Sequence, residues 1–349
     1  MKNKSIYKVK SNLVSTNPYV YKTPSVSAKA IRIIVMLGLQ IILLGVTKSF
    51  SALKLICATT LGAAAAYSIH YVFYRKQHFA VLNTIIQGIM IGMLLPESYP
   101  VVTAFFISFF VIFISKYIFA NCITSWVNVI AIAVIVAWFI GQRFFPGYQV
   151  TSDIISLKNP SVFLIQNGTF KVFGFDTFIT NFLNNTVLSW LKVTLPEGII
   201  SILCDTQSVI PAFRFNLLTI FASIVLFSDD SYSSLIPSVF IISYLMLVRL
   251  LFPVMVGGEF NQGDIILAMC SSGTLFITVF IIAWFGTHPM TTLGKIIYGI
   301  IAGVIAFFIV GCGTSPIGMI YTVLICNVLN LIIRVIEEKR NENLVCKLV

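Results

Sequence analysis

The sequence is poor in charged residues, and in acidic ones above all. Only 10% of its 349 residues are Asp, Glu, Lys or Arg, and only 12 are acidic, whereas soluble domains carry about 25% charged residues. It contains no phosphate-binding glycine loop, catalytic triad or pair of catalytic carboxylates, and its three histidines lack metal-ligand spacing. These absences exclude a soluble enzyme, a hydrolase and a disordered chain.

The sequence also lacks closely spaced pairs of cysteines, since none of its seven cysteines forms a C-x-x-C motif. Most lie in apolar runs and are expected to be small buried hydrophobic residues, with an iron–sulfur site shared between chains as the alternative. What the sequence does contain is 58% hydrophobic residues, 30 Phe and a mean hydropathy of +0.96. This composition predicts a polytopic membrane protein. The net charge of +11 fits lysines at span ends, and no nucleic-acid partner is expected.

Ten apolar runs approach the length of about 20 residues that a membrane-spanning helix needs. They are continuous rather than alternating, which favours helices over a β-barrel, so the predicted fold class is all-α. The ten predicted spans are Ile31–Val46, Ser51–Phe73, Phe79–Leu95, Val101–Phe119, Trp126–Gly141, Ile210–Phe227, Leu235–Val256, Ile265–Phe285, Ile296–Val310 and Pro316–Ile333.

The order of these spans divides the chain into two five-helix halves. We predict a cytoplasmic N-terminal tail (1–30), a first half (31–141), an extracytoplasmic loop or cap (142–209), a second half (210–335) and a cytoplasmic C-terminal tail (336–349). Both termini are placed in the cytoplasm because most Lys and Arg of the short segments fall on that side. Two halves of five spans indicate an internal repeat of the transporter type.

Three stretches of the chain resemble one family of membrane proteins. Thr287, Pro289, Gly294 and Lys295 match a run after the eighth span, and the third span carries Gly88–Pro96. With the entry segment Ser15–Ser25, their order resembles the RnfD/NqrB family. This family comprises the D subunit of the Rnf ion-translocating electron-transport complex and the B subunit of the sodium-pumping NADH:quinone reductase. His288 departs from the family's usual Asp.

The resemblance implies a flavoprotein of the bacterial inner (plasma) membrane that works with other complex subunits in redox-driven sodium or proton translocation. Family members carry flavin mononucleotide (FMN) through a Thr phosphoester, and riboflavin is a further expected flavin. The nearest match to the flavin motif is Asp176–Leu183, so Thr180 is the candidate anchor, with Thr177 and Asp176 beside it; Thr186 is a second candidate. The small residues of the family's flavin motif are replaced by larger ones in this sequence. The same holds for two other stretches that are rich in glycine in the family. The alternative is therefore a transporter, or a scaffold, that has lost the flavin.

Other polar residues carry separate expectations. Ser272–Thr274 is predicted to be a close-packing patch within one continuous helix, or to border a flavin or quinone. Lys116 is expected to reach the cytoplasmic interface. Asp264 is expected to cap a helix or, with Glu259, to form an ion entry. Arg249 is expected to pair with an acid or a phosphate-bearing cofactor.

Overall fold

The computed structural model describes residues 25–73, 78–118, 127–147, 152–155, 157, 159–228, 233–284, 287–312 and 315–346. All regular structure within these ranges is helical, which confirms the predicted all-α class. Most of the predicted N-terminal tail, including the resemblance segment Ser15–Pro24, lies outside the described residues. So does the run Phe119–Trp126, which joins the fourth and fifth predicted spans.

The first half forms five helical segments. Ser25 caps the first, since its side chain accepts a hydrogen bond from Ala28 N, and Asn128 caps the last in the same way through Ile130 N. The segments are α1 (Val26–Val46), α2 (Phe50–Phe73), α3 (His78–Leu94), α4 (Val101–Ile112) with its π-helical extension η1 (Phe113–Ile118), and α5 (Val129–Gly141), which continues into the 3₁₀ turn η2 (Gln142–Phe144).

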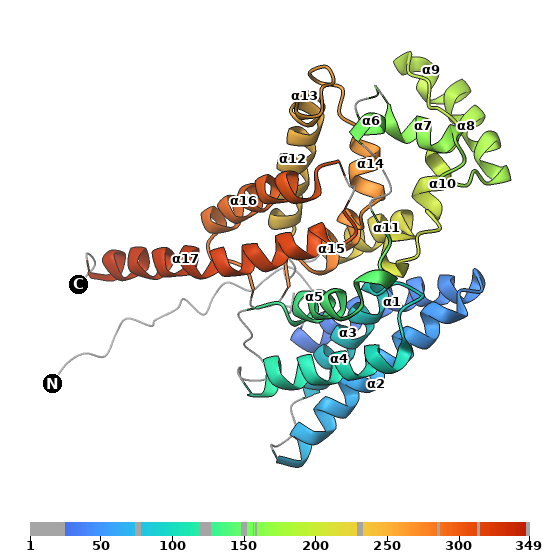
Figure 1. Cartoon of the computed structure of the whole chain (residues 1–349). Helices are drawn as coiled ribbons and strands as arrows, with labels where there is room; N and C mark the ends of the chain where they lie inside the picture. Colours follow the sequence, from blue (N-terminus) through green and yellow to red (C-terminus); the bar gives the residue numbers. More distant parts are fainter. Residues whose placement is uncertain are drawn as a thin grey trace, which may run out of the picture.

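The segment between the halves folds as five short helices, which we call the cap. They are α6 (Ser152–Ile155), α7 (Pro160–Gln166), α8 (Gly174–Thr186), α9 (Leu188–Leu191) and α10 (Ile199–Cys204). In Figure 1 the helices α6–α10, coloured from light green to yellow, lie together at one end of the molecule, which we call the cap end.

The second half begins with the 3₁₀ turn η3 (Pro211–Phe213). It continues with α11 (Asn216–Phe227), α12 (Leu235–Leu250), α13 (Phe252–Met255), α14 (Ile265–Cys270), α15 (Thr274–Phe280), α16 (Thr292–Val310) and α17 (Gly318–Cys346). Four described stretches, in α1, α2, α16 and α17, are long and apolar enough to cross a membrane, and five shorter apolar helices accompany them. These helices support the predicted membrane protein.

The two halves share a packing pattern. Helix α2 packs on α3 and α4, while α12 packs on α14 and α16; α1 meets α11, and α5 meets α17. Figure 1 shows α1–α4 on one side and α11–α17 on the other. Helix α1 ends at the cap end, where α11 begins, so these corresponding helices run in opposite directions, as in an inverted repeat.

Glycines allow the closest of these helix contacts. A Cβ added to Gly92 of α3 would lie 2.7 Å from Ile56 Cα of α2, and one added to Gly88 would lie 2.9 Å from Thr60 Cα. Real Cβ atoms do not approach backbone so closely, so α3 can pack on α2 only without these side chains. The motif Gly88–Pro96 noted in the sequence therefore has a packing role here.

The structure corrects several predicted boundaries. The expected spans Leu235–Val256 and Ile265–Phe285 are each broken, at Leu251 and at Ser271–Gly273. The sixth helix begins at Asn216 rather than Ile210, because Pro211 starts a 3₁₀ turn. Helix α17 continues to Cys346 through most of the expected tail 336–349, and α1 begins inside the expected tail 1–30. Charged residues, rather than a loss of helix, end these apolar runs.

Candidate functional site

The three predicted flavin residues all lie on α8 of the cap. Asp176 and Thr180, one turn apart, face inward and are 0% and 1% exposed. Thr180 Oγ1 donates to Asp176 Oδ1 at 3.0 Å. The same carboxylate accepts from Gly198 N at 2.8 Å, Ser201 N at 2.6 Å and Ser201 Oγ at 2.7 Å. Thr177 is exposed, and its hydroxyl donates to Gly174 O. The carboxylate thus fastens α8 to α10.

This environment does not suit a phosphoester on Thr180. Burial by itself would raise the pKa of Asp176, but hydrogen bonds from Ser201, Gly198 and Thr180 together hold that pKa below its ordinary value. The carboxylate is therefore ionised at neutral pH. A phosphate on Thr180 would place like charges together in a buried site and would displace the hydroxyl donor. The residues present at Thr180 do not fit FMN.

A break between α14 and α15 supplies a second, independent candidate site. The helix stops at Cys270 and restarts at Thr274, with Ser271–Gly273 between them. Asn216 Nδ2 of α11 donates to Cys270 O at 3.1 Å, and Thr274 Oγ1 donates to Ala268 O at 2.8 Å. The close-packing patch predicted here is buried, but the continuous helix predicted around it is wrong. Buried carbonyl and hydroxyl oxygens now lie side by side.

Gly273 sets the geometry of the break. Its φ is +67°, in the left-handed region that a residue with a side chain adopts at a cost. A Cβ there would collide with the ring of Phe213, which lies just before α11. The break is thus wedged against the start of α11, and this contact holds Asn216 over the freed carbonyl.

Polar contacts between the two halves continue from the break. Thr219, one turn after Asn216, accepts a hydrogen bond from Gln40 Nε2 of α1 at 3.1 Å. Asn128, at the start of α5, donates to Ile281 O just beyond α15 at 3.3 Å. Thr278 is fully buried on α15 between these contacts. Polar side chains therefore follow the junction of the halves away from the cap end.

Two asparagines on α17 extend this polar region. Asn327 and Asn330 are 0% and 2% exposed, and their side-chain oxygens have no hydrogen-bond partner within the described part of the chain. Helices α5 and α17 are antiparallel, with Trp138 packed edge-on against Tyr321. Unsatisfied buried amides typically bind water or an ion.

Three further charged residues named in the sequence analysis, Asp264, Arg249 and Lys116, have structural partners. Asp264 caps α14, as predicted, by accepting from two backbone N–H groups of its first turn, and it also accepts from Ser161 N of the cap. Arg249 donates to Asn261 Oδ1 and Gly263 O rather than to an acid. The interface position predicted for Lys116 is wrong. The residue is 2% exposed, and its ammonium donates to Thr84 Oγ1 at 2.7 Å.

No role was predicted from the sequence for Arg214 or Asn216. The structure makes Arg214 the centre of an ion cluster at the cap end, bidentate to Asp205 at 2.7 and 3.0 Å and 3.5 Å from Glu97. It also donates to Ser49 Oγ. In the sequence, the only sign of these contacts is that two polar residues, Arg214 and Asn216, lie at the start of an otherwise apolar run.

The chain matches a known protein family. The model of the NQR2, RnfD, RnfE family matches residues 13–342. No curated protein matches the chain.

Proposed function

Since the chain belongs to the NQR2, RnfD, RnfE family of membrane subunits of Rnf- and Nqr-type complexes, we propose that it couples electron transfer in its complex to transport of sodium ions or protons. The family match covers nearly the whole chain, so it applies to both halves and to the cap. Its partners are then the other subunits of such a complex and the surrounding lipid bilayer.

The ion-transport part of this proposal rests on the break between α14 and α15. In transporters built from inverted repeats, ions bind where helices are interrupted at the repeat interface, on carbonyls at half-helix ends. Here Cys270 O and Ala268 O lie at the interruption and accept hydrogen bonds from side chains, and the hydroxyls of Ser272 and Thr274 lie beside them. Oxygen ligands suit a hard cation such as sodium, and hydroxyls and water serve proton transfer equally well.

Orientation follows from lysine and arginine placement together with the fold. The start of α1 and the end of α17 both lie away from the cap end. Because Lys and Arg of the short segments gather near those ends, we place them in the cytoplasm and the cap outside the bacterial inner membrane. The ion path then runs from the break toward Asn327 and Asn330 on the cytoplasmic side.

The Asp176–Thr180 contact favours a second candidate function. The buried carboxylate argues against a flavin on Thr180. The second candidate is therefore a transporter or scaffold of the same fold that has lost the flavin. These readings differ in whether ion movement requires a reductant. Reductant-driven ion uptake into membrane vesicles is the experiment that tests the proposed coupling.

Covalent flavin is tested on a denaturing gel. The tagged full chain is purified from cells that flavinylate a known control protein, and the gel is viewed under ultraviolet light. We expect a dark band for the wild type, since Thr180 is buried against Asp176. A fluorescent band that Thr180→Ala abolishes would overturn this expectation. A band lost only in Thr177→Ala would place the flavin on the exposed hydroxyl instead.

A further inference from the structure

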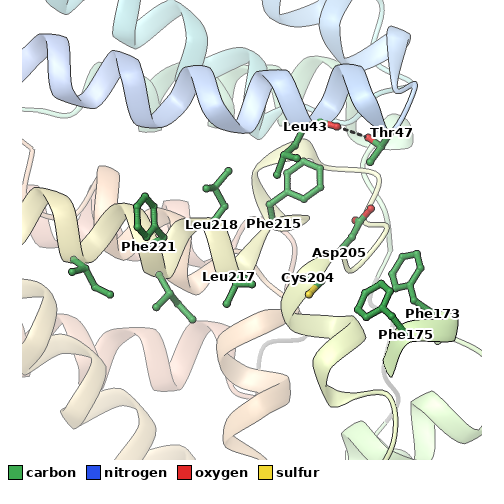
Figure 2. Close-up of a pocket in the computed structure, with 12 residues that line it drawn as sticks. Leu43, Thr47, Phe173, Phe175, Cys204, Asp205, Phe215, Leu217, Leu218 and Phe221 are labelled. Carbon is green, nitrogen blue, oxygen red and sulfur yellow. Dashed lines mark hydrogen bonds between the residues drawn. The ribbon is translucent and has the colours of Figure 1, made fainter. Parts of the chain in front are cut away.

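An apolar groove of about 720 Å³ opens at the cap end between α1, α11 and the start of α8. Figure 2 shows Leu43 of α1, Leu217, Leu218 and Phe221 of α11, and the stacked rings of Phe173 and Phe175 around it. This volume is typical of sites that hold a small organic molecule. Almost all of its lining is hydrocarbon, so its occupant must be apolar along most of its length.

The groove continues onto surfaces that face the bilayer. On α11, Leu217, Phe221 and Ile224 are 53%, 51% and 65% exposed, and they lie on one face at helical spacing. A helix in a membrane exposes such a face to lipid chains. An occupant can therefore enter the groove sideways from the bilayer.

Helix α8 marks the level of the membrane surface. Phe175, Phe178 and Phe182 share one exposed face of α8, while its opposite face buries the polar pair Asp176 and Thr180. An amphipathic helix with an exposed aromatic face lies along the boundary between headgroups and acyl chains. Since Phe175 also lines the groove, the groove opens at the depth where a phospholipid changes from headgroup to chain.

Two exposed lysines lie close in the chain to residues that line the groove. Lys48 directly follows the lining residue Thr47, and Lys171 lies two residues before Phe173; both are exposed, and neither forms an ion pair among the described residues. The acid in the groove wall, Asp205, is already paired bidentately with Arg214. These two lysines, which form no ion pair with the described residues, are therefore available to a negatively charged headgroup.

We propose that this groove binds an anionic phospholipid, with one acyl chain along α11 and its phosphate within reach of Lys48 and Lys171. Charge complementarity selects this occupant. An isoprenoid quinone would bring no charge to the two lysines. A zwitterionic lipid would bring a phosphate whose charge its own ammonium group balances, and a partner helix would not need the lysines. The proposal requires only that the chain lies in a bilayer, so it is independent of electron transfer.

Native mass spectrometry of the full chain in detergent tests this site, with dioleoyl-phosphatidylglycerol and dioleoyl-phosphatidylcholine as probes. We expect one tightly bound phosphatidylglycerol. The double variant Lys48→Gln/Lys171→Gln should bind it roughly 10- to 30-fold more weakly, because each lysine near a membrane surface contributes about 1 kcal/mol to anionic lipid binding. The matched control Lys339→Gln/Arg340→Gln removes the same charge at the far end of α17 and should bind like the wild type.

A groove-filling variant separates the chain contact from the charge contact. Leu217→Trp should lose both lipids while it keeps the wild-type elution profile on size exclusion. The proposal is overturned if the wild type binds both lipids equally, or if the double lysine variant keeps its affinity for phosphatidylglycerol. It is also overturned if a quinone co-purifies with the wild type and is lost from Leu217→Trp.

Discussion

Replacing Arg214 with methionine should destabilise the folded chain by about 3–5 kcal/mol, the usual cost of removing one partner from a buried ion pair. The guanidinium side chain is 9% exposed and holds Asp205 bidentately, with Glu97 at 3.5 Å. Without it, two carboxylates face each other at the junction of both halves. Thermal unfolding in detergent, followed by loss of the monodisperse peak, should shift down by roughly 5 °C.

The control for this prediction is Arg143→Met. Arg143 is exposed at the same end of the molecule and only covers the Phe144 ring, so its loss should cost about 0.5–1 kcal/mol. The double variant Arg214→Met/Asp205→Asn should recover part of the stability, because it removes a stranded carboxylate. Equal stability of the Arg214 and Arg143 variants would show that the ion cluster does not hold the halves together.

Replacing Asp176 with leucine should open the cap, at a cost of about 3–5 kcal/mol. The substitution strands four donors, namely the N–H groups of Gly198 and Ser201 and the hydroxyls of Ser201 and Thr180. Each buried donor left without an acceptor costs about 1–3 kcal/mol, and such costs are less than additive. Hydrogen exchange at Gly198 and Ser201, and protease cleavage between α8 and α10, should both accelerate.

The same carboxylate predicts a pH dependence. Its pKa is lowered in the folded state, so its contribution is present above the unfolded value of about 3.9 and is lost as pH falls through the folded pKa. Cap protection should stay constant from pH 7 to about pH 5 and decline below about pH 4. Thr177→Ala, which removes only an exposed hydroxyl, should change neither exchange nor pH dependence. Equal effects of the two variants would contradict the buried role of Asp176.

The fold class was predictable because a bilayer imposes its constraint on each segment separately. An apolar run must satisfy its own backbone, so it forms a helix whatever its neighbours are. The helix cap at Asp264 was predictable for the same local reason. The family could be named from the order of short motifs, such as Gly88–Pro96 and Thr287–Lys295, although each alone is weak.

The features that the sequence did not reveal depend on contacts between distant residues. The apolar pattern of Ile265–Phe285 does not mark a break, because the freed carbonyl of Cys270 is satisfied by Asn216 on another helix. Lys116 is buried because Thr84 on α3 offers an acceptor. Thr180 matched a motif by spacing, but Asp176, which accepts its hydrogen bond, is held by Ser201 of α10, far along the chain. In each case the contact joins residues that are far apart in the sequence. Helical periodicity describes only neighbouring residues, so it cannot predict such contacts.

Reductant-driven ion uptake tests the central proposal most directly. Inside-out membrane vesicles are prepared from cells that lack this chain and from cells that express wild-type, Asn216→Leu or Asn181→Leu protein. Asn216 contacts the helix break, whereas Asn181 is exposed on the cap, so Asn181→Leu serves as the matched control. Each preparation receives NADH, and uptake of radioactive sodium and internal acidification are recorded.

We predict that uptake of one of the two ions requires both NADH and this chain. It should fall at least about tenfold, some 1.4 kcal/mol, in the Asn216 variant at wild-type protein levels, and should stay unchanged in the Asn181 variant. Vesicles without the chain that accumulate ions at the wild-type rate, or wild-type uptake that proceeds equally without a reductant, would contradict the proposal.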